Sequence, residues 1–208
     1  MSDPHASQVR IGLAGSPGVT VGCGLLVTPR HVVTCAHVVA EALADPAFAL
    51  ASAAPAGAVP LDLPLLAVSF RTSGRVVCWH PARDDGTKIP EDIAVLELAD
   101  EAPAAAAPAA LLALDAEDYT QRPVHCFGFP AAIDEGVRRS GTCRGENALG
   151  RVQLDVERGL VQGGFSGTAA WDPTQGAVVG GGGRAYRGSI RPAHPGAHPI
   201  CRPDLERG

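Results

Sequence analysis

Short apolar segments separated by turn residues occupy most of the chain. Each is four to nine residues long and is bounded by regions with Gly, Pro or Asp, which is typical of strands in an all-β sandwich or barrel. The segments in the first half are 21–27, 31–37, 63–70, 74–80 and 92–98. Those in the second half are 122–129, 136–144, 151–157, 167–172 and 176–180. The pattern therefore predicts an all-β protein.

Helical and linker patterns are few. Residues 36–44 have the apolar pattern of a helix of about two turns that ends before Asp45 and Pro46. Residues 101–110, EAPAAAAPAA, are rich in Pro and Ala without a core pattern, so they predict a connector. The chain is thus expected to divide into two β-rich halves, roughly 1–100 and 115–208.

The composition limits the classes of partner. The chain is 46% hydrophobic and 19% charged, as in a globular protein, and its formal net charge is −5. That charge argues against nucleic acid or an anionic membrane as a partner, since both need dense Lys and Arg. No apolar run is long enough to span a membrane, and the N-terminus lacks the pattern of a secretory signal. A cytoplasmic location is therefore expected.

The six cysteines do not form a metal-binding pattern. They include no C-x-x-C pair and no zinc-type spacing, so free buried thiols in a reducing compartment are the better interpretation. His194, His198 and Cys201 lie close together in the sequence, but the prolines between them prevent a shared helical face. The sequence predicts no metal and no cofactor.

Three polar residues near strand ends have the chemistry of a peptide-cleaving site. His37 ends VVTCAH, Asp92 opens DIAVLEL, and Ser166 lies in GGFSG. Acyl transfer from a peptide needs a nucleophile, a base that takes its proton and a carboxylate that orients the base. It also needs backbone N–H groups directed at the oxyanion, for which the glycine-rich loop offers Gly164 and Ser166. In isolation, Ser166 would be interpreted as an ordinary turn residue.

The order of these residues along the chain distinguishes between folds. An α/β-hydrolase carries Ser first, then the acid, then His, around a G-x-S-x-G sequence. Here the order is His, Asp, Ser, and Ser166 is followed by Gly167 and Thr168, so that pattern is absent. Since alternating helices are also lacking, an esterase of that class is disfavoured.

At these residues the sequence resembles the trypsin-like, chymotrypsin-fold serine peptidases, over roughly residues 8–180. VTCAHVV is similar to the family's T-A-A-H block, EDIAVLEL to its D-I-A-L-L block and GGFSG to its G-D-S-G block. CFGFP and GFSGTAAWD are closest to a bacterial, intracellular branch. The resemblance implies His37 as base, Asp92 as orienting acid and Ser166 as nucleophile, with Gly164 and Ser166 forming the oxyanion hole.

The resemblance also implies two packed antiparallel β-barrels of the six-stranded, chymotrypsin-like type. The N-terminal barrel, over residues 1–100, would carry His and Asp. A connector over 101–114 would lead to a C-terminal barrel over 115–180 that carries Ser. Residues 181–208 form an atypical tail with four prolines and five arginines, which is poor strand material. This tail either completes the second barrel or stays disordered and leaves it incomplete.

Phe165, Cys23 and Leu160 mark departures from the family pattern. Phe165 replaces an aspartate that pairs with a freshly cut N-terminus, so we expect no such activation and a loop held by packing. Cys23 matches a cysteine whose bridging partner position is Val38 here, so that disulfide is missing. Leu160 would lie at the floor of the substrate pocket, where a carboxylate would favour Arg or Lys.

Two functions follow from these residues. The leading hypothesis is a cytoplasmic serine endopeptidase that hydrolyses peptide bonds through an acyl-enzyme, with a polypeptide as its substrate. The alternative, motivated by the tail, is a catalytically degenerate peptidase-like module that binds a partner in a signalling or defence system. Sensor or effector proteins of the same system are candidate partners in either case.

Cys35 lies two residues before His37 and would be oxidation-sensitive if it were exposed. The better interpretation is that Cys35 is a small buried residue.

Overall fold

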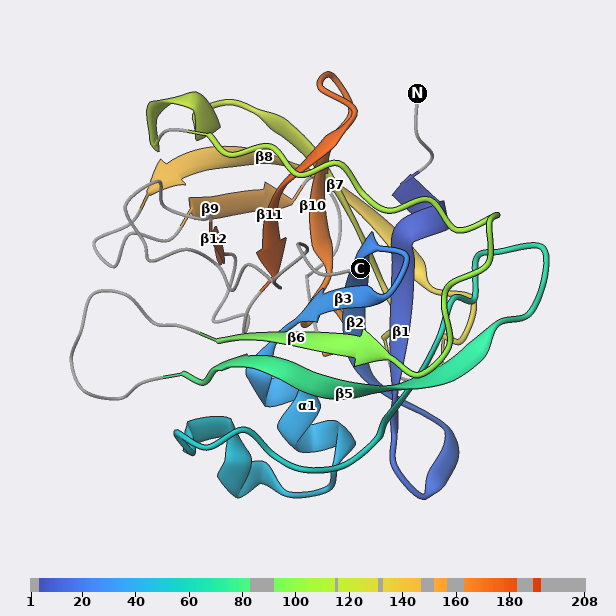
Figure 1. Ribbon diagram of the computed structural model, residues 1–208. Coiled ribbons are helices and arrows are strands. Elements are labelled where there is room, and N and C mark those ends of the chain that lie inside the picture. The colour runs from blue at the N-terminus through green and yellow to red at the C-terminus, as the bar shows by residue number, and fades with distance from the viewer. Residues whose placement is uncertain are drawn as a thin grey trace, which may run out of the picture.

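The computed structural model describes residues 4–82, 92–114, 116–130, 133–146, 152–156, 163–182 and 189–191. It shows two antiparallel sheets joined by an extended segment, with a single short α-helix in the part described (Figure 1). The all-β prediction is confirmed. No helix in this part is long and apolar enough to cross a membrane.

The first sheet is a closed barrel of six strands in the order β1-β2-β3-β6-β5-β4. The strands are β1 (Gln8–Leu13), β2 (Ser16–Thr28), β3 (His31–Thr34), β4 (Val59–Asp62), β5 (Arg71–His80) and β6 (Ile93–Leu98). Ile11 of β1 pairs with Leu61 of β4, which closes the ring. Alternate side chains of these strands fill the interior, including Val9, Ile11, Leu26, Val32 and Leu96, each of which is fully buried.

One strand prediction is wrong. Residues 63–70 form an irregular loop rather than a strand, and the strand at this place is β4, just before them. A turn explains the difference: the Leu66 N–H donates to the Leu63 carbonyl at 3.4 Å, and Pro64 occupies the second position of this turn, which proline favours. The Leu63 N–H donates to the Phe70 carbonyl at 3.2 Å, which closes the loop on itself.

A short helix follows β3, as the sequence predicts. Helix α1 (Ala36–Ala42) buries every residue except Glu41 against the first barrel, and Cys35 is its N-cap. After it, Asp45 accepts a hydrogen bond from the Ala47 N–H and begins a 3₁₀ helix, η2 (Pro46–Leu50). Two further 3₁₀ helices are η1 (Pro4–Ser7) and η3 (Ala116–Tyr119).

The second sheet has the strand order β10-β11-β12-β9-β8-β7. Its strands are β7 (Pro123–Gly128), β8 (Val137–Glu146), β9 (Val152–Val156), β10 (Ala169–Asp172), β11 (Ala177–Gly182) and β12 (Ser189–Arg191). Strand β12 pairs with β11 and with β9 through two residues each, and Trp171 of β10 pairs with His125 of β7. Thus part of the region predicted to be poor strand material, 181–182 and 189–191, is paired. Residues 183–188 and 192–208 lie outside the described part.

The predicted connector runs between the two sheets without forming a helix or a strand. The Ala109 N–H donates to the Leu26 carbonyl of β2 at 2.9 Å. The Val178 N–H of β11 donates to the Ala110 carbonyl at 2.8 Å. Consecutive residues of the connector therefore bond to both sheets. A small apolar cluster completes this interface; its buried members are Leu25, Ala109, Ala169, Trp171 and Val178.

Candidate active site

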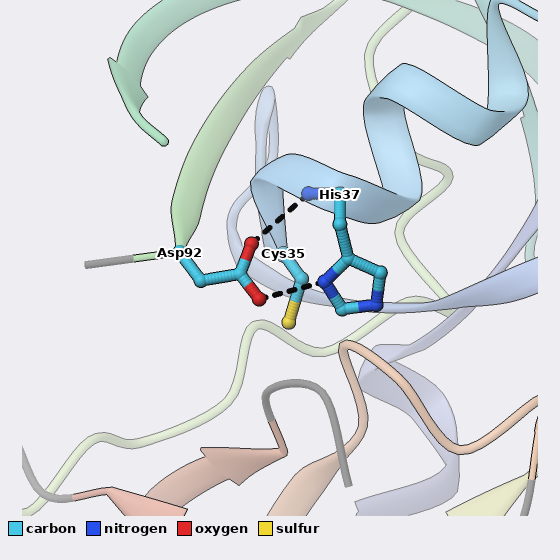
Figure 2. A group of neighbouring side chains, drawn as sticks. All are labelled: Cys35, His37 and Asp92. Atoms are coloured by element: carbon cyan, nitrogen blue, oxygen red, sulfur yellow. Dashed lines mark hydrogen bonds and ion pairs between the residues drawn. The ribbon is translucent and has the colours of Figure 1, made fainter. Parts of the chain in front are cut away.

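The structure brings His37 and Asp92 together, as the sequence predicts. His37 is in the first turn of α1, directly after β3, and Asp92 immediately precedes β6, the neighbour of β3 in the barrel. The two atoms His37 Nδ1 and Asp92 Oδ2 lie 2.6 Å apart, and the His37 backbone N–H donates to Asp92 Oδ1 at 3.0 Å (Figure 2). The carboxylate is therefore held by the backbone and the ring of one residue, which fixes the rotation of the imidazole.

Both side chains of this pair are shielded from water. The exposed fraction is 9% for the His37 side chain and 15% for that of Asp92. An ionised carboxylate so little exposed needs hydrogen-bond donors, and His37 supplies two. Because Asp92 faces Nδ1, the neutral imidazole with its proton on Nδ1 is favoured, and Nε2 is left as a proton acceptor.

Ser166 lies in a loop that is attached to the first barrel. The Cys23 N–H of β2 donates to the Ser166 carbonyl at 2.7 Å, and Ser166 is half-buried. A Cβ placed on Gly22 would lie 2.8 Å from both methyl carbons of Val38 and 2.9 Å from the Ser166 carbonyl oxygen. The residue after His37 and the backbone of Ser166 thus meet over Gly22.

Gly167 continues this close contact. Its φ is +80°, and a Cβ there would lie 2.0 Å from the Cys23 carbonyl oxygen, so no other residue fits. The Thr34 hydroxyl donates to the same carbonyl at 2.6 Å. The Gly167 backbone also hydrogen-bonds to the thiol of Cys35, two residues before His37. The loop after the serine is thereby tied to the segment that carries the histidine.

Phe165 holds the other side of the loop by packing. Its side chain is 1% exposed and belongs to the core of the second sheet. A Cβ on Gly128 of β7 would lie 2.6 Å from the ring of Phe165, so the ring rests directly on the backbone of that strand. The Thr168 hydroxyl donates to the Phe127 carbonyl of the same strand. The prediction that packing holds this loop is confirmed.

Hydrogen bonds of the loop determine the direction of its N–H groups. The Phe165 carbonyl accepts from the Thr168 N–H at 3.0 Å. This bond closes a turn over residues 165–168. The Phe165 C=O and the Ser166 N–H belong to the same trans peptide and point in opposite directions, so the Ser166 N–H points out of the turn. Gly164 has φ +91°, and its carbonyl accepts from the Phe129 N–H at 2.9 Å. In the described part of the chain, neither Gly164 nor Ser166 donates its N–H to a backbone acceptor.

The structure corrects the match made at Cys23. The residue opposite Val38 is Gly22, one position earlier, whereas the Cys23 thiol points the other way and donates to the Gly164 carbonyl at 3.2 Å. The expected absence of a bridge to position 38 stands, because Cys23 is a free thiol. The sequence match at Cys23 was therefore one residue out of register. The register is set by the bond between the Cys23 N–H and the Ser166 carbonyl, and motif spacing does not reveal that contact.

The cysteines are mostly as predicted. Cys23, Cys35, Cys126 and Cys143 are buried thiols outside any disulfide, whereas Cys78 is disulfide-bonded, so the prediction of free thiols is wrong there. Burial raises the pKa of Cys23 to about 12 and that of Cys35 well above its ordinary value; the Asp92 carboxylate adds to the effect at Cys35. Both are therefore neutral thiols.

Leu160, predicted at the floor of the substrate pocket, lies outside the described residues. Sequence reasoning did not identify the roles of Gly22 and Gly128, which make room for the loop. A glycine within an apolar strand is the available signal, since it often marks the close approach of another backbone or ring.

The chain matches known proteins at the level of family and fold. Residues 22–180 match the family described as "Trypsin-like peptidase domain". A crystal structure of Rv3671c from M. tuberculosis H37Rv, an inactive form of a serine-to-alanine mutant, is 20% identical, with a TM-score of 0.59 over 91% of this chain and 83% of that one. A crystal structure of Deg5 is 20% identical, with a TM-score of 0.61 over 90% of this chain and 84% of that one.

A search of curated proteins found no match. At 20% identity the two structures establish the fold, whereas the family match covers more than half of the chain and includes all three blocks around His37, Asp92 and Ser166. The protein therefore belongs to the trypsin-like peptidase family and is a serine peptidase of that class.

Proposed function

We propose that this protein is a serine endopeptidase that cleaves polypeptides through an acyl-enzyme, with His37, Asp92 and Ser166 as its triad. The observation that carries the proposal is the His37–Asp92 pair, in which one carboxylate accepts from both the ring and the backbone of the histidine. Nε2 of His37 is then the base for the Ser166 hydroxyl, whose loop meets the residue after His37 over Gly22.

The reaction has two steps in this proposal. The Ser166 Oγ attacks the peptide carbonyl carbon while its proton passes to His37 Nε2, and the imidazolium then protonates the leaving amine. Water hydrolyses the ester with the same base, and Ser166 regains its proton. Asp92 orients the ring and stabilises the imidazolium. The N–H groups of Gly164 and Ser166 serve as the oxyanion hole, in which each donor contributes about 3–4 kcal/mol to the stability of the transition state.

The proposal includes the two packed β-barrels that the resemblance to the trypsin-like peptidases implies. Residues 1–100 form the first barrel, 101–114 the connector and 115–180 most of the second. Strand β12, from the region 181–208, supplies a short link between β11 and β9. Leu160 is proposed at the pocket floor, where it favours an apolar substrate side chain. Three further points remain predictions: that the protein is bacterial, that it is located in the cytoplasm, and that it works beside sensor or effector proteins.

A fluorophosphonate probe tests the nucleophile. The purified chain should react with one equivalent of probe, and peptide mapping should place the label on Ser166. The Ser166→Ala variant should lose both labelling and cleavage of a casein or peptide-library substrate. Ser140→Ala is a matched control, since Ser140 lies in β8 and pairs with His125 of β7. Labelling that survives Ser166→Ala would overturn the assignment.

The same experiment decides between the peptidase and a binding module. A degenerate binding module would fold but would neither react with the probe nor cleave the substrate, because binding a partner does not require a histidine that can deprotonate Ser166. An active peptidase should show at least a roughly 1,000-fold loss of turnover in Ser166→Ala, because only binding and the oxyanion hole would remain.

A further inference from the structure

The thiol of Cys35 lies next to the His37–Asp92 pair and takes part in no step of the proposed reaction. A ligand atom of each of the three residues lies within 4.8 Å of those of the other two. Figure 2 shows the Cys35 sulfur beside the hydrogen bond that joins the His37 ring to the Asp92 carboxylate. A thiol, an imidazole and a carboxylate are together a strong ligand set for Zn²⁺.

We propose that Cys35, His37 and Asp92 form an inhibitory zinc site that competes with the catalytic hydrogen bond. The metal would bind Cys35 Sγ, His37 Nδ1 and one Asp92 oxygen. Three protein ligands leave the fourth tetrahedral position for a water molecule. The metal site itself is independent of the peptidase activity, whereas its inhibitory effect rests on the proposed function.

The ligand atoms, which lie within 4.8 Å of one another, would have to move by roughly 1 Å to surround the ion. Zinc binds S at about 2.3 Å and N or O at about 2.0–2.2 Å, so neighbouring ligand atoms in a tetrahedron lie about 3.3–3.7 Å apart. His37 Nδ1 and Asp92 Oδ2, now 2.6 Å apart, would separate by less than about 1 Å. Asp92 is the most exposed of the three, so the ion would enter from the carboxylate side.

Protons balance in this binding step. The Cys35 thiol gives up its proton to solvent and binds as a thiolate. The proton on His37 Nδ1 is displaced, and the neutral ring takes up a proton on Nε2, so the histidine has no net change. The Gly167 N–H, which already bonds to the Cys35 sulfur, stabilises the thiolate.

This change of tautomer explains why the metal would inhibit. With its proton on Nε2, His37 has no lone pair for the Ser166 hydroxyl, and Nδ1 is held by the metal. Locking a catalytic histidine in the wrong tautomer costs about 10⁴ in rate in the peptidases where it has been forced by mutation. Zinc should therefore suppress acylation without contacting Ser166.

The metal site can be tested without any enzyme activity. Co²⁺ added to the reduced full-length chain should give a tetrahedral visible spectrum and a thiolate charge-transfer band in the near ultraviolet. Zinc should abolish both, and competition with a chromophoric chelator gives its affinity. Cys35→Ala should lose the charge-transfer band and at least about 100-fold of the zinc affinity, since even losing an outer partner of a ligand costs 10–100-fold.

The matched control is Cys143→Ala, a buried free thiol in β8 of the second sheet. It should keep the Co²⁺ spectrum and the zinc affinity, as should Ser166→Ala. Cys35→Ser serves if the alanine variant does not fold, as judged by its near-ultraviolet circular dichroism. An absent charge-transfer band, or zinc affinity that is equal in the wild type and the Cys35 variants, overturns the site.

Fluorophosphonate labelling then tests inhibition separately. In the wild type, zinc at saturating concentration should slow labelling by at least about 100-fold, and a chelator should restore it. Labelling at full rate with metal bound overturns the inhibitory role while leaving the metal site intact. A chain that binds Co²⁺ through Cys35 but never reacts with the probe would instead refute the proposed peptidase function.

Discussion

Phe165 and Gly128 should be strongly coupled in stability, because each occupies space that the other would need. The Phe165 ring lies where a Cβ on Gly128 would be, at 2.6 Å from the nearest ring carbon. Phe165→Ala removes a fully buried ring, and Gly128→Ala inserts a methyl group beneath it. In the double variant, the inserted methyl enters the space that the ring has left.

Each single change has a magnitude that the structure sets. Phe165 is 1% exposed, so Phe165→Ala should lower the free energy of unfolding by about 3–5 kcal/mol. Gly128→Ala overpacks the same place and should cost about 1–3 kcal/mol. The double variant should be about 1–3 kcal/mol more stable than the sum of the two losses predicts, since the methyl partly fills the cavity.

Urea unfolding of the four proteins, followed by tryptophan fluorescence, measures this cycle. Gly12→Ala is the matched control, because the nearest atom to its Cβ would be 3.5 Å away and its effect should stay within about 0.5 kcal/mol. A cycle built from Gly12 and Phe165 should be additive. If the Gly128 and Phe165 losses also add within about 0.5 kcal/mol, the ring does not rest on β7 and the account of the loop is wrong.

Three other predictions follow from single contacts. Asp92→Asn should keep the fold but slow fluorophosphonate labelling by about 10⁴, because an amide that faces the ring favours the wrong tautomer; an unchanged labelling rate, measured by mass spectrometry, would remove Asp92 from the site. Gly167→Ala should prevent the native loop from forming, whereas Gly176→Ala, with φ +64° in open space, should cost only about 1–2 kcal/mol; equal shifts in thermal unfolding would contradict this. Arg122→Leu should cost about 3–5 kcal/mol at neutral pH, because Asp172 is fully buried and Arg122 is its ion-pair partner. Burial raises the Asp172 pKa, but Arg122 and two backbone N–H groups lower it overall, so this stabilisation is present above the unfolded-state pKa of about 3.9 and is lost as the pH falls further. Urea unfolding from pH 7 to pH 2 should therefore show a flatter acid decline in Arg122→Leu, and an identical decline would exclude the pair.

Local patterns in the sequence were sufficient to predict that His37 and Asp92 lie together. Both stand next to strands whose apolar residues are easily recognised, and the barrel places those strands side by side. The helix after β3 was predictable for the same reason, since Asp45 and Pro46 end its apolar pattern. In each case, the decisive information lies within a few residues.

Contacts between distant segments were not predictable in this way. The register of Cys23 against the serine loop joins residues more than a hundred positions apart, so a motif match could slip by one residue. Residues 63–70 are apolar enough for a strand, yet Pro64 and the bond from Leu63 to Phe70 make them a loop. Strand β12 has a polar and proline-rich neighbourhood and becomes a strand only because β9 and β11 offer free edges.

The bond from the Cys23 N–H to the Ser166 carbonyl has a mechanical consequence. The serine belongs to the second half of the chain, yet its loop is bonded both to β2, in the barrel that carries the histidine and the aspartate, and to the β7 segment of the second sheet. A movement of one sheet against the other would therefore have to strain or break one of these two sets of bonds at the serine loop. The serine loop is thus one of the segments that hold the two sheets together, and a change that loosens the loop should loosen the contact between the sheets as well.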